Sequence, residues 1–273
     1  MSELYLSCPP LADYVEEISE VAGYLWQKGW AECNGGNLSV DISHILEGHE
    51  CRFEKEEHRG LDHTYSPLGG HYFLVTGSGY RFRDLARNVK DNACILRVDN
   101  DGSGYTIVWG GGNSPNFRPT SEFASHLSIH KLLLDRGSDE RVVLHTHPTE
   151  LIALTHFPEY KSESAINRAL WGMLPEVKVI IPCGVGIVPY ALPGSQKLAE
   201  GTIDAFNRGH SVILWEMHGC LATGKDAIEA FDQIDTLNKA AEILLLCRAA
   251  GQHPSGISEV QLKELVKAFN LKE

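Results

Sequence analysis

The chain has 273 residues, 43% of them apolar, and it carries 36 acidic against 24 basic side chains for a formal net charge of −12. This apolar content can bury a large core, in one large domain or two small ones. The acidic chain carries no basic stripe, which argues against a nucleic-acid binder. No run of about 18 apolar residues predicts a membrane span.

The terminal segment and the cysteines predict a cytoplasmic protein. The N-terminal sequence MSELYLSCPP lacks the basic and apolar regions of a secretory signal. The seven cysteines are scattered, odd in number and without a CxxC pair, so they are predicted to be reduced thiols.

The first half of the chain alternates between helical and strand patterns. Apolar residues from Leu11 to Trp26 follow helical spacing and predict a helix near 11–28 that ends at Gly29. A second helix, capped by Thr120 or Ser121, is predicted to stop at Gly137. The polar, Glu- and His-rich stretch at about 44–70 is predicted to be an exposed insertion. Strands are predicted at NLSVDI (37–42), HYFLVTG (71–77), ACILRVD (93–99) and YTIVWG (105–110), the last two joined by the turn NDGSG.

The second half continues the alternation. Strands are predicted at RVVLHTH (141–147), VKVII (177–181), GIVPY (186–190) and SVILWEMHG (211–219), and helices near 195–208, from Ile228 to Gly251, and after a capping box of Ser258 and Gln261. No linker or internal repeat interrupts the pattern. It predicts a single α/β layered domain over residues 1–273, with a mixed sheet because tight turns join several strands.

Two histidines, His145 and His147, stand one residue apart at the end of a predicted strand. Residues i and i+2 of a strand point to the same face, so both imidazoles could bind one metal ion. Catalytic Zn²⁺ takes three protein ligands and keeps one position open, and His218 ends another apolar strand. A chance pairing among 13 histidines is the alternative, but the shared position at strand ends favours a metal site.

Three turns are rich in hydrogen-bond donors and suit a phosphate monoester: CNGGNLSV (33–40), VTGSGY (75–80) and RPTSE (118–122). Gly35 and Gly36 let the backbone approach a ligand closely, and a helix that begins near Thr120 offers an anion site. Each turn alone also matches an ordinary turn. No P-loop, dinucleotide fingerprint or HExxH motif is present.

Five motifs occur in order along the chain: GGNLSV, TGSG, PTSE, HTHP and HG. Together they resemble the class II, zinc-dependent aldolase family that splits sugar 1-phosphates. The resemblance covers nearly the whole chain, although the 44–70 stretch matches none of the family's motifs. It implies a three-layer αβα sandwich with a mixed, mostly antiparallel central sheet, as in class II aldolases and adducin, assembled as a homotetramer.

The resemblance also implies the site residues. The zinc ligands, for one ion per subunit, would be His145, His147 and His218. Glu122 would be the catalytic acid/base, and Glu176 would reach the active site of a neighbouring subunit; spacing alone selects neither among 36 acidic residues. The substrate phosphate would be held by Asn34, Gly36, Asn37, Thr76, Ser78, Thr120 and Ser121.

The implied reaction is the reversible cleavage of L-rhamnulose 1-phosphate to dihydroxyacetone phosphate and L-lactaldehyde. Zinc would stabilise the developing enediolate charge as a Lewis acid, while Glu122 would exchange the C3 proton. The expected partners are small sugar phosphates and aldehydes and other copies of the chain, with no nucleic acid or membrane. L-Fuculose-1-phosphate cleavage, L-ribulose-5-phosphate 4-epimerisation and a non-catalytic adducin-like scaffold are the alternatives.

Overall fold

The computed structural model describes residues 8–47, 49, 51–53, 55–112, 114 and 116–271. Contacts divide the chain into two compact units, the first of residues 1–146 with 224–228 and the second of residues 147–223 with 229–273. None of the helices in the described ranges has the length and apolar character needed to span a membrane. The prediction of one domain over the whole chain stays a prediction.

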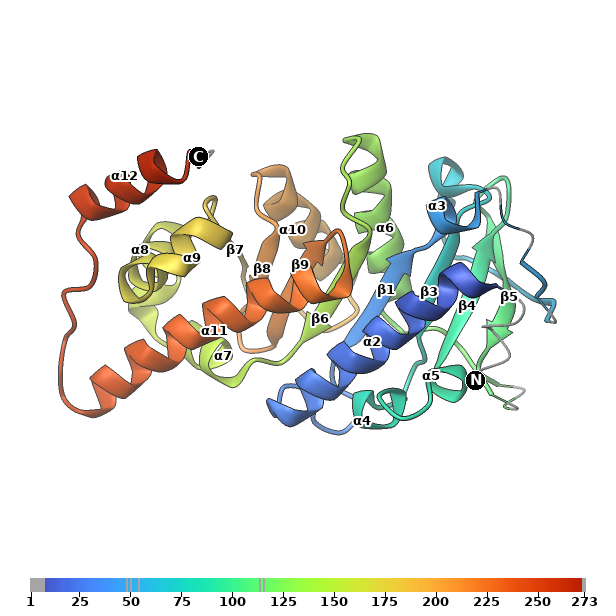
Figure 1. Cartoon of the computed structure of the whole chain (residues 1–273), viewed down its shortest axis with the longest axis horizontal. Coiled ribbons are helices and arrows are strands. Elements are labelled where there is room, and N and C mark those ends of the chain that lie inside the picture. The colour runs from blue at the N-terminus through green and yellow to red at the C-terminus, as the bar shows by residue number, and fades with distance from the viewer. Residues whose placement is uncertain are drawn as a thin grey trace. The chain divides into compact units, whose positions relative to one another are not determined.

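The first unit contains an antiparallel sheet with the strand order β2-β5-β4-β3-β1-β6. Its elements are, in chain order, α2 (Pro9–Gln27), β1 (Asn37–Asp41), α3 (Ser43–Leu46), β2 (Glu57–Gly60), η1 (Ser66–Leu68), β3 (Tyr72–Thr76), α4 (Phe82–Leu85), α5 (Val89–Asn92), β4 (Ala93–Val98), β5 (Gly104–Gly110), α6 (Phe123–Asp135) and β6 (Val142–Thr146) (Figure 1). The predicted helix near 11–28, the strands of this half and the β4–β5 hairpin are confirmed.

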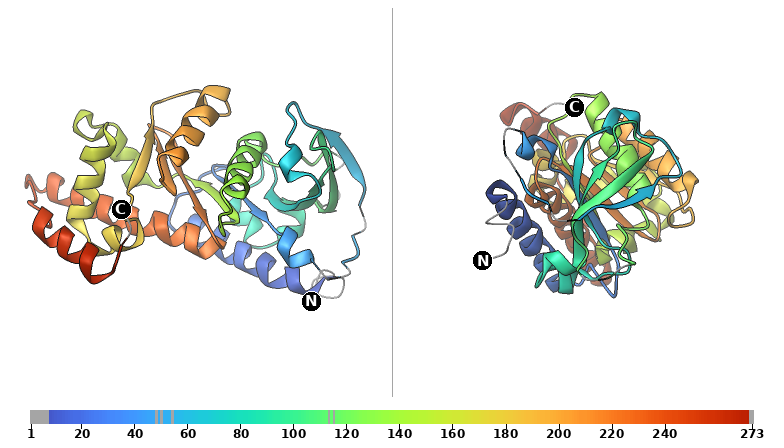
Figure 2. Two further views of the ribbon diagram at one scale, coloured as in Figure 1. Left: turned by 90° about the horizontal axis from the view of Figure 1, so that it is seen from above. Right: turned by 90° about the vertical axis from the view of Figure 1, so that its right-hand side faces the viewer.

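Helices cover both faces of this sheet, as Figure 2 shows for α2 in blue and α6 in light green. Strand β1 explains why, because its residues alternate between the two faces. Ser39 points toward α6, where it hydrogen-bonds to His126, and the buried Leu38 and Val40 point the other way. The helix–sheet–helix layering predicted from the family resemblance is therefore present in this unit.

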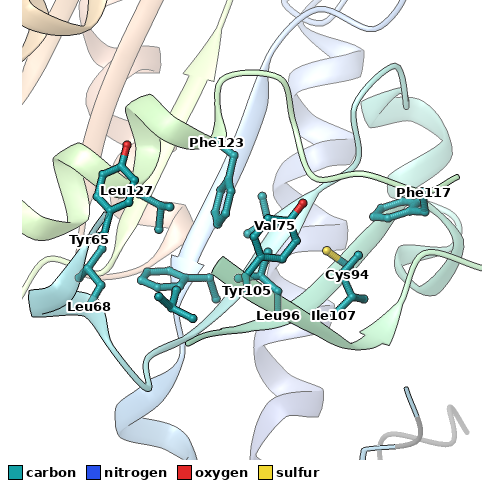
Figure 3. Close-up of a cluster of buried hydrophobic side chains, with 12 residues drawn as sticks. Tyr65, Leu68, Val75, Cys94, Leu96, Tyr105, Ile107, Phe117, Phe123 and Leu127 are labelled. Carbon is teal, nitrogen blue, oxygen red and sulfur yellow. The ribbon is translucent and has the colours of Figure 1, made fainter. Parts of the chain in front are cut away.

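A buried apolar cluster fills the space between the sheet and α6 (Figure 3). Phe73 of β3 and Leu127 of α6 are both fully buried within it. Tyr65 and Leu68 belong to the same cluster, and β2 pairs with β5. Strand β2 thus joins the sheet, and Tyr65 and Leu68 join the core, while residues 62–64, 66 and 67 are exposed. The exposed insertion at about 44–70 stays a prediction. The N-cap position of α6 is Glu122, whose side chain makes no capping hydrogen bond, rather than Thr120 or Ser121.

The second unit contains a parallel strand pair, which makes the fold mixed α/β as predicted. Strands β7 and β8 run parallel and are joined by α10, which packs against both, and β9 pairs antiparallel with β8. The elements are α7 (Thr149–Thr155), η2 (Pro158–Tyr160), α8 (Glu163–Met173), α9 (Pro175–Ile180), β7 (Val185–Val188), α10 (Gln196–Asn207), β8 (Val212–Trp215), β9 (Gly219–Gly224), most of α11 (Ala227–Ala249) and α12 (Glu259–Ala268).

Two sequence predictions fail in this unit. The VKVII stretch, predicted as a strand, forms helix α9, which begins at Pro175. Its Lys178 is buried, with Nζ 3.9 Å from the centre of the Trp171 ring and 2.9 Å from the Pro182 carbonyl oxygen. The fully buried strand β9 has no counterpart in the sequence prediction. The capping box of Ser258 and Gln261 is present at the start of α12.

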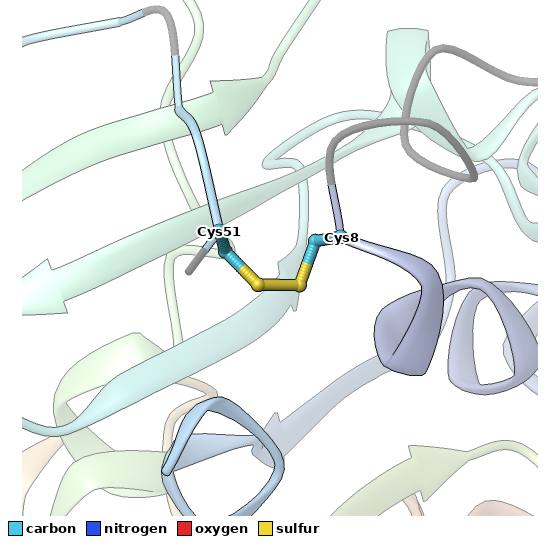
Figure 4. The surroundings of a disulfide bond; sticks show 2 residues. All are labelled: Cys8 and Cys51. Atoms are coloured by element: carbon cyan, nitrogen blue, oxygen red, sulfur yellow. A yellow bond between two sulfur atoms is a disulfide. The ribbon is translucent and has the colours of Figure 1, made fainter. Parts of the chain in front are cut away.

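A disulfide joins Cys8, just before α2, to Cys51, which is 43 residues further along the chain (Figure 4). The prediction that all seven cysteines are reduced is therefore wrong for this pair. The other five are free thiols, at positions 33, 94, 183, 220 and 247.

Candidate active site

The Gly/Asn loop between α2 and β1 lies against the strand that carries the first histidine. Gly36 has φ +79°, in the left-handed region where a Cβ is unfavourable. A Cβ at Gly36 would stand 2.7 Å from the carbonyl oxygen of His145 and 2.8 Å from Cε2 of Phe82. Directly after this loop, Asn37 pairs with His145 in the β1–β6 ladder. Only glycine allows the loop to approach β6 this closely.

The Asn37 side chain contacts the carboxylate predicted to be the acid/base. Its Nδ2 lies 2.8 Å from Oε2 of Glu122, to which it donates a hydrogen bond. Asn37 is buried and Glu122 is half-buried at the start of α6. The Glu122 backbone N–H also donates to the hydroxyl of Thr120 at 3.3 Å. One predicted phosphate ligand therefore holds the predicted catalytic group directly.

The two other donor-rich turns meet each other in the first unit. The backbone N–H of Thr120 donates to the carbonyl of Thr76 at 2.8 Å, and that of Ser78 donates to the carbonyl of Arg118 at 2.9 Å. The hydroxyl of Thr76 exchanges hydrogen bonds with the backbone of Leu38, next to Asn37. Three segments far apart in sequence are thus adjacent. The side chains of Ser78 and Ser121 are exposed on these turns, and that of Asn34 is exposed on its loop.

A pocket at this point has a positively charged side chain, Arg81, among its lining residues, and the sequence analysis did not name it. It is lined by Gly36, Thr76, Tyr80, Arg81, Phe82, Leu85 and Asn92. Arg81 directly precedes α4 and is half-buried. Sequence reasoning sought donors without charge in an acidic chain, so it passed over this arginine beside two predicted phosphate ligands.

In the second unit, the rings of His147 and His218 lie with their centres 5.5 Å apart and their planes tilted by 56°. Met217, which precedes His218, adopts φ +58°, and its backbone N–H donates to the hydroxyl of Thr155 at 2.9 Å. The His218 ring also lies 5.0 Å from that of Trp215, whose indole N–H donates to Thr202. A strained turn and a fixed aromatic ring therefore orient His218.

The three predicted ligands converge. The nitrogen atoms that His145, His147 and His218 could offer a metal all lie within 4.8 Å of one another. His145 is buried, and the other two are half-buried. Three imidazoles with an accessible side match the ligand set and open position of a catalytic zinc site. Glu176, by contrast, is exposed in the first turn of α9, and its reach into a neighbouring subunit stays a prediction.

Comparisons with known proteins identify the family of the chain. Residues 16–245 match the family model described as class II aldolase and adducin N-terminal domain. A protein of Bacteroides thetaiotaomicron named rhamnulose-1-phosphate aldolase is 43% identical over 272 residues, covering 99% of both chains. One of the same name from Listeria welshimeri is 37% identical, covering 95% of this chain and 93% of the relative.

A solved structure supports the fold. The sugar-phosphate aldolase of Thermotoga maritima superposes with a TM-score of 0.78 at 33% identity, covering 90% of this chain and 99% of the other. The family match covers well over half of the sequence, and these relatives align over nearly its full length. The chain therefore belongs to the class II aldolase and adducin family.

Proposed function

We propose that this chain is a zinc-dependent rhamnulose-1-phosphate aldolase, which reversibly cleaves L-rhamnulose 1-phosphate to dihydroxyacetone phosphate and L-lactaldehyde. The observation that supports the reaction class most is the convergence of His145, His147 and His218. The substrate is supported by the relatives of that name, which align over 93% or more of their own length.

The three histidines fit a zinc ion, because they supply nitrogen donors alone and lie within reach of one centre. An ion bound there would supply Lewis-acid stabilisation of the negative charge that develops when the C3–C4 bond breaks. The remaining steps fall to the chain's own groups.

Glu122 is the group that moves a proton. In cleavage the C4 hydroxyl loses its proton as the C3–C4 bond breaks and the aldehyde carbonyl forms, and Glu122 delivers a proton to C3 of the dihydroxyacetone phosphate fragment. In synthesis Glu122 removes the proton from C3, and the C4 oxygen gains one. The hydrogen bond from Asn37 keeps the carboxylate in place. A base that is held in a fixed position does not need to be reoriented during the reaction.

The donor-rich turns hold the phosphate. Backbone and hydroxyl donors near Gly36, Thr76 and Thr120 would bind it, with the charge of Arg81 close by. Binding of this remote group fixes the reacting carbons and contributes to the rate without touching them. The proposal includes a homotetramer, to which Glu176 contributes across subunits. A cytoplasmic location stays a prediction, because the Cys8–Cys51 disulfide removes one of its two grounds.

Product identification tests the proposal. The purified protein is incubated with L-rhamnulose 1-phosphate, L-fuculose 1-phosphate or L-ribulose 5-phosphate, each with and without chelator. We expect dihydroxyacetone phosphate and L-lactaldehyde from the first substrate, loss of activity on chelation and recovery with Zn²⁺. Preferential turnover of either other substrate would reject the substrate assignment, and full activity of metal-free protein would reject the metal.

A pair of histidine variants separates the metal role from a general effect of losing an imidazole. His147→Ala should lose bound zinc, measured by elemental analysis, together with activity. His156→Ala removes an exposed histidine after α7 that is outside the cluster and should keep one zinc per subunit. Equal zinc content in the two variants would contradict the assignment of His147.

A further inference from the structure

A chain of buried polar side chains lies behind Glu122, and the proposed reaction does not use it. Ser39, His126 and His130 are 0%, 1% and 3% exposed. The Ser39 hydroxyl lies 2.7 Å from Nδ1 of His126 and 2.7 Å from Nε2 of His130. On its other side, His126 Nε2 lies 2.5 Å from Oδ1 of Asn37, the residue that contacts Glu122. Burying polar groups is unfavourable unless they are hydrogen-bonded, and these are.

The spacing of these residues along β1 and α6 brings their side chains together. Asn37 and Ser39 are two residues apart in β1 and so share one face of the strand. His126 and His130 are four residues apart in α6 and so share one face of the helix. The two polar pairs therefore meet between the sheet and α6.

The direction of every hydrogen bond in the chain follows from the carboxylate. An ionised carboxylate only accepts, so the Asn37 atom facing Glu122 is the amide nitrogen. The amide oxygen then faces His126, whose Nε2 must donate. In a neutral imidazole the other nitrogen accepts, so the Ser39 hydroxyl donates to His126.

The last bond completes the series. Because the Ser39 hydroxyl hydrogen is used on His126, its oxygen accepts from Nε2–H of His130. Burial keeps both rings neutral, since it lowers the pKa of His126 to about 3 and that of His130 to about 4. Each donor in the chain points toward Glu122.

We propose that His126, backed by Ser39 and His130, is a positioning residue for the acid/base. Its Nε2–H fixes the Asn37 amide with the nitrogen toward Glu122. A flipped amide would set its carbonyl oxygen against the carboxylate, and repulsion between two acceptors would displace the base. This inference rests on the proposed function, because the role of Glu122 is part of it.

Two substitutions at His126 separate orientation from packing. His126→Gln can place an amide N–H where Nε2 stands and so still donate to Asn37, whereas His126→Asn matches only the Nδ1 position. We expect His126→Asn to lower kcat on the order of 10- to 100-fold, with KM changed much less, because a hydrogen bond that positions a charged group is lost. His126→Gln should restore most of kcat. Zinc content should be the same in both.

Leu127→Ala is the control for loss of stability. Leu127 follows His126 on α6 but lies in the apolar cluster, so its truncation should lower the thermal midpoint without changing kcat. Equal kcat for His126→Asn and His126→Gln would overturn the proposal. So would a rise in KM at unchanged kcat, because the chain would then act on phosphate binding.

A spectroscopic measurement on the wild-type protein tests the chain even if a variant fails to fold. Nitrogen-15 NMR of histidine-labelled protein should show His126 and His130 neutral at pH 7, both carrying the proton on Nε2. A proton on Nδ1 of His126 would overturn the proposal. If the wild type does not cleave L-rhamnulose 1-phosphate, the proposed function fails, and the NMR result still decides whether the hydrogen-bond chain exists.

Discussion

Replacing Gly36 with alanine should disturb the site far more than the same change at Gly29. Both glycines have a positive φ, +79° and +74°, and a residue with a Cβ there costs about 1–2 kcal/mol. At Gly29 a Cβ meets nothing within 4 Å, but at Gly36 it meets the His145 carbonyl oxygen at 2.7 Å. Forcing such a contact into a packed region costs about another 1–3 kcal/mol. Gly36→Ala should therefore lower the free energy of unfolding by about 2–5 kcal/mol.

Urea unfolding of both variants measures this difference. The contact at Gly36 is with the backbone of a predicted metal ligand, so Gly36→Ala should also reduce bound zinc and turnover, whereas Gly29→Ala should keep both. An equal loss of unfolding free energy in the two variants, with zinc and kcat unchanged, would refute the close approach between the loop and β6.

Three further predictions concern single groups. Glu122→Gln should keep fold and zinc but lower kcat by about 10²–10⁴-fold, since the proton transfer is lost. If this variant still exchanged the C3 hydrogens of dihydroxyacetone phosphate with deuterated water, Glu122 would be excluded as the base. Burial alone would raise the pKa of Asp41, but hydrogen bonds from His71 and Ser43 outweigh it and lower the pKa to about 2. Its stabilisation of about 2 kcal/mol is therefore present above pH 4 and lost as the pH falls toward 2, and urea titrations of Asp41→Asn should lack this loss. Reduction of Cys8–Cys51 frees the chain between two residues 43 apart in sequence, which should lower the free energy of unfolding by about 4 kcal/mol, and thiol titration of the denatured protein should rise from five to seven; seven thiols without reductant would contradict the disulfide.

Much of the fold followed from apolar periodicity, and the failures have physical reasons. The VKVII stretch is short and apolar, and such runs do not separate strand from helix by periodicity. The deciding signal was Pro175 at the first helical position. Strand β9, Gly219–Gly224, was missed because its two terminal glycines and its alanine are poor strand formers, although the strand is buried throughout.

In the candidate site, too, some residues could be predicted from the sequence and others could not. The three predicted metal ligands could be named because their motifs are local, and their side-chain nitrogens lie within 4.8 Å of one another. The chain behind Glu122 was missed because the polar face of β1 reads as solvent-facing in sequence, whereas α6 covers it with His126 and His130. Two histidines four residues apart on a predicted helix were the available signal. No sequence rule pairs Cys8 with Cys51 among seven cysteines.

The pairing of β1 with β6 has a consequence for biosynthesis. Asn37 leaves the ribosome about 100 residues before its ladder partner His145, which at ordinary elongation rates is a delay of roughly 5–20 s. Strand β3 is made in the meantime and can occupy one side of β1. The other edge of β1 has no partner until β6 is made. A nascent chain stalled before β6 would therefore contain the glycine loop without His145 beside it.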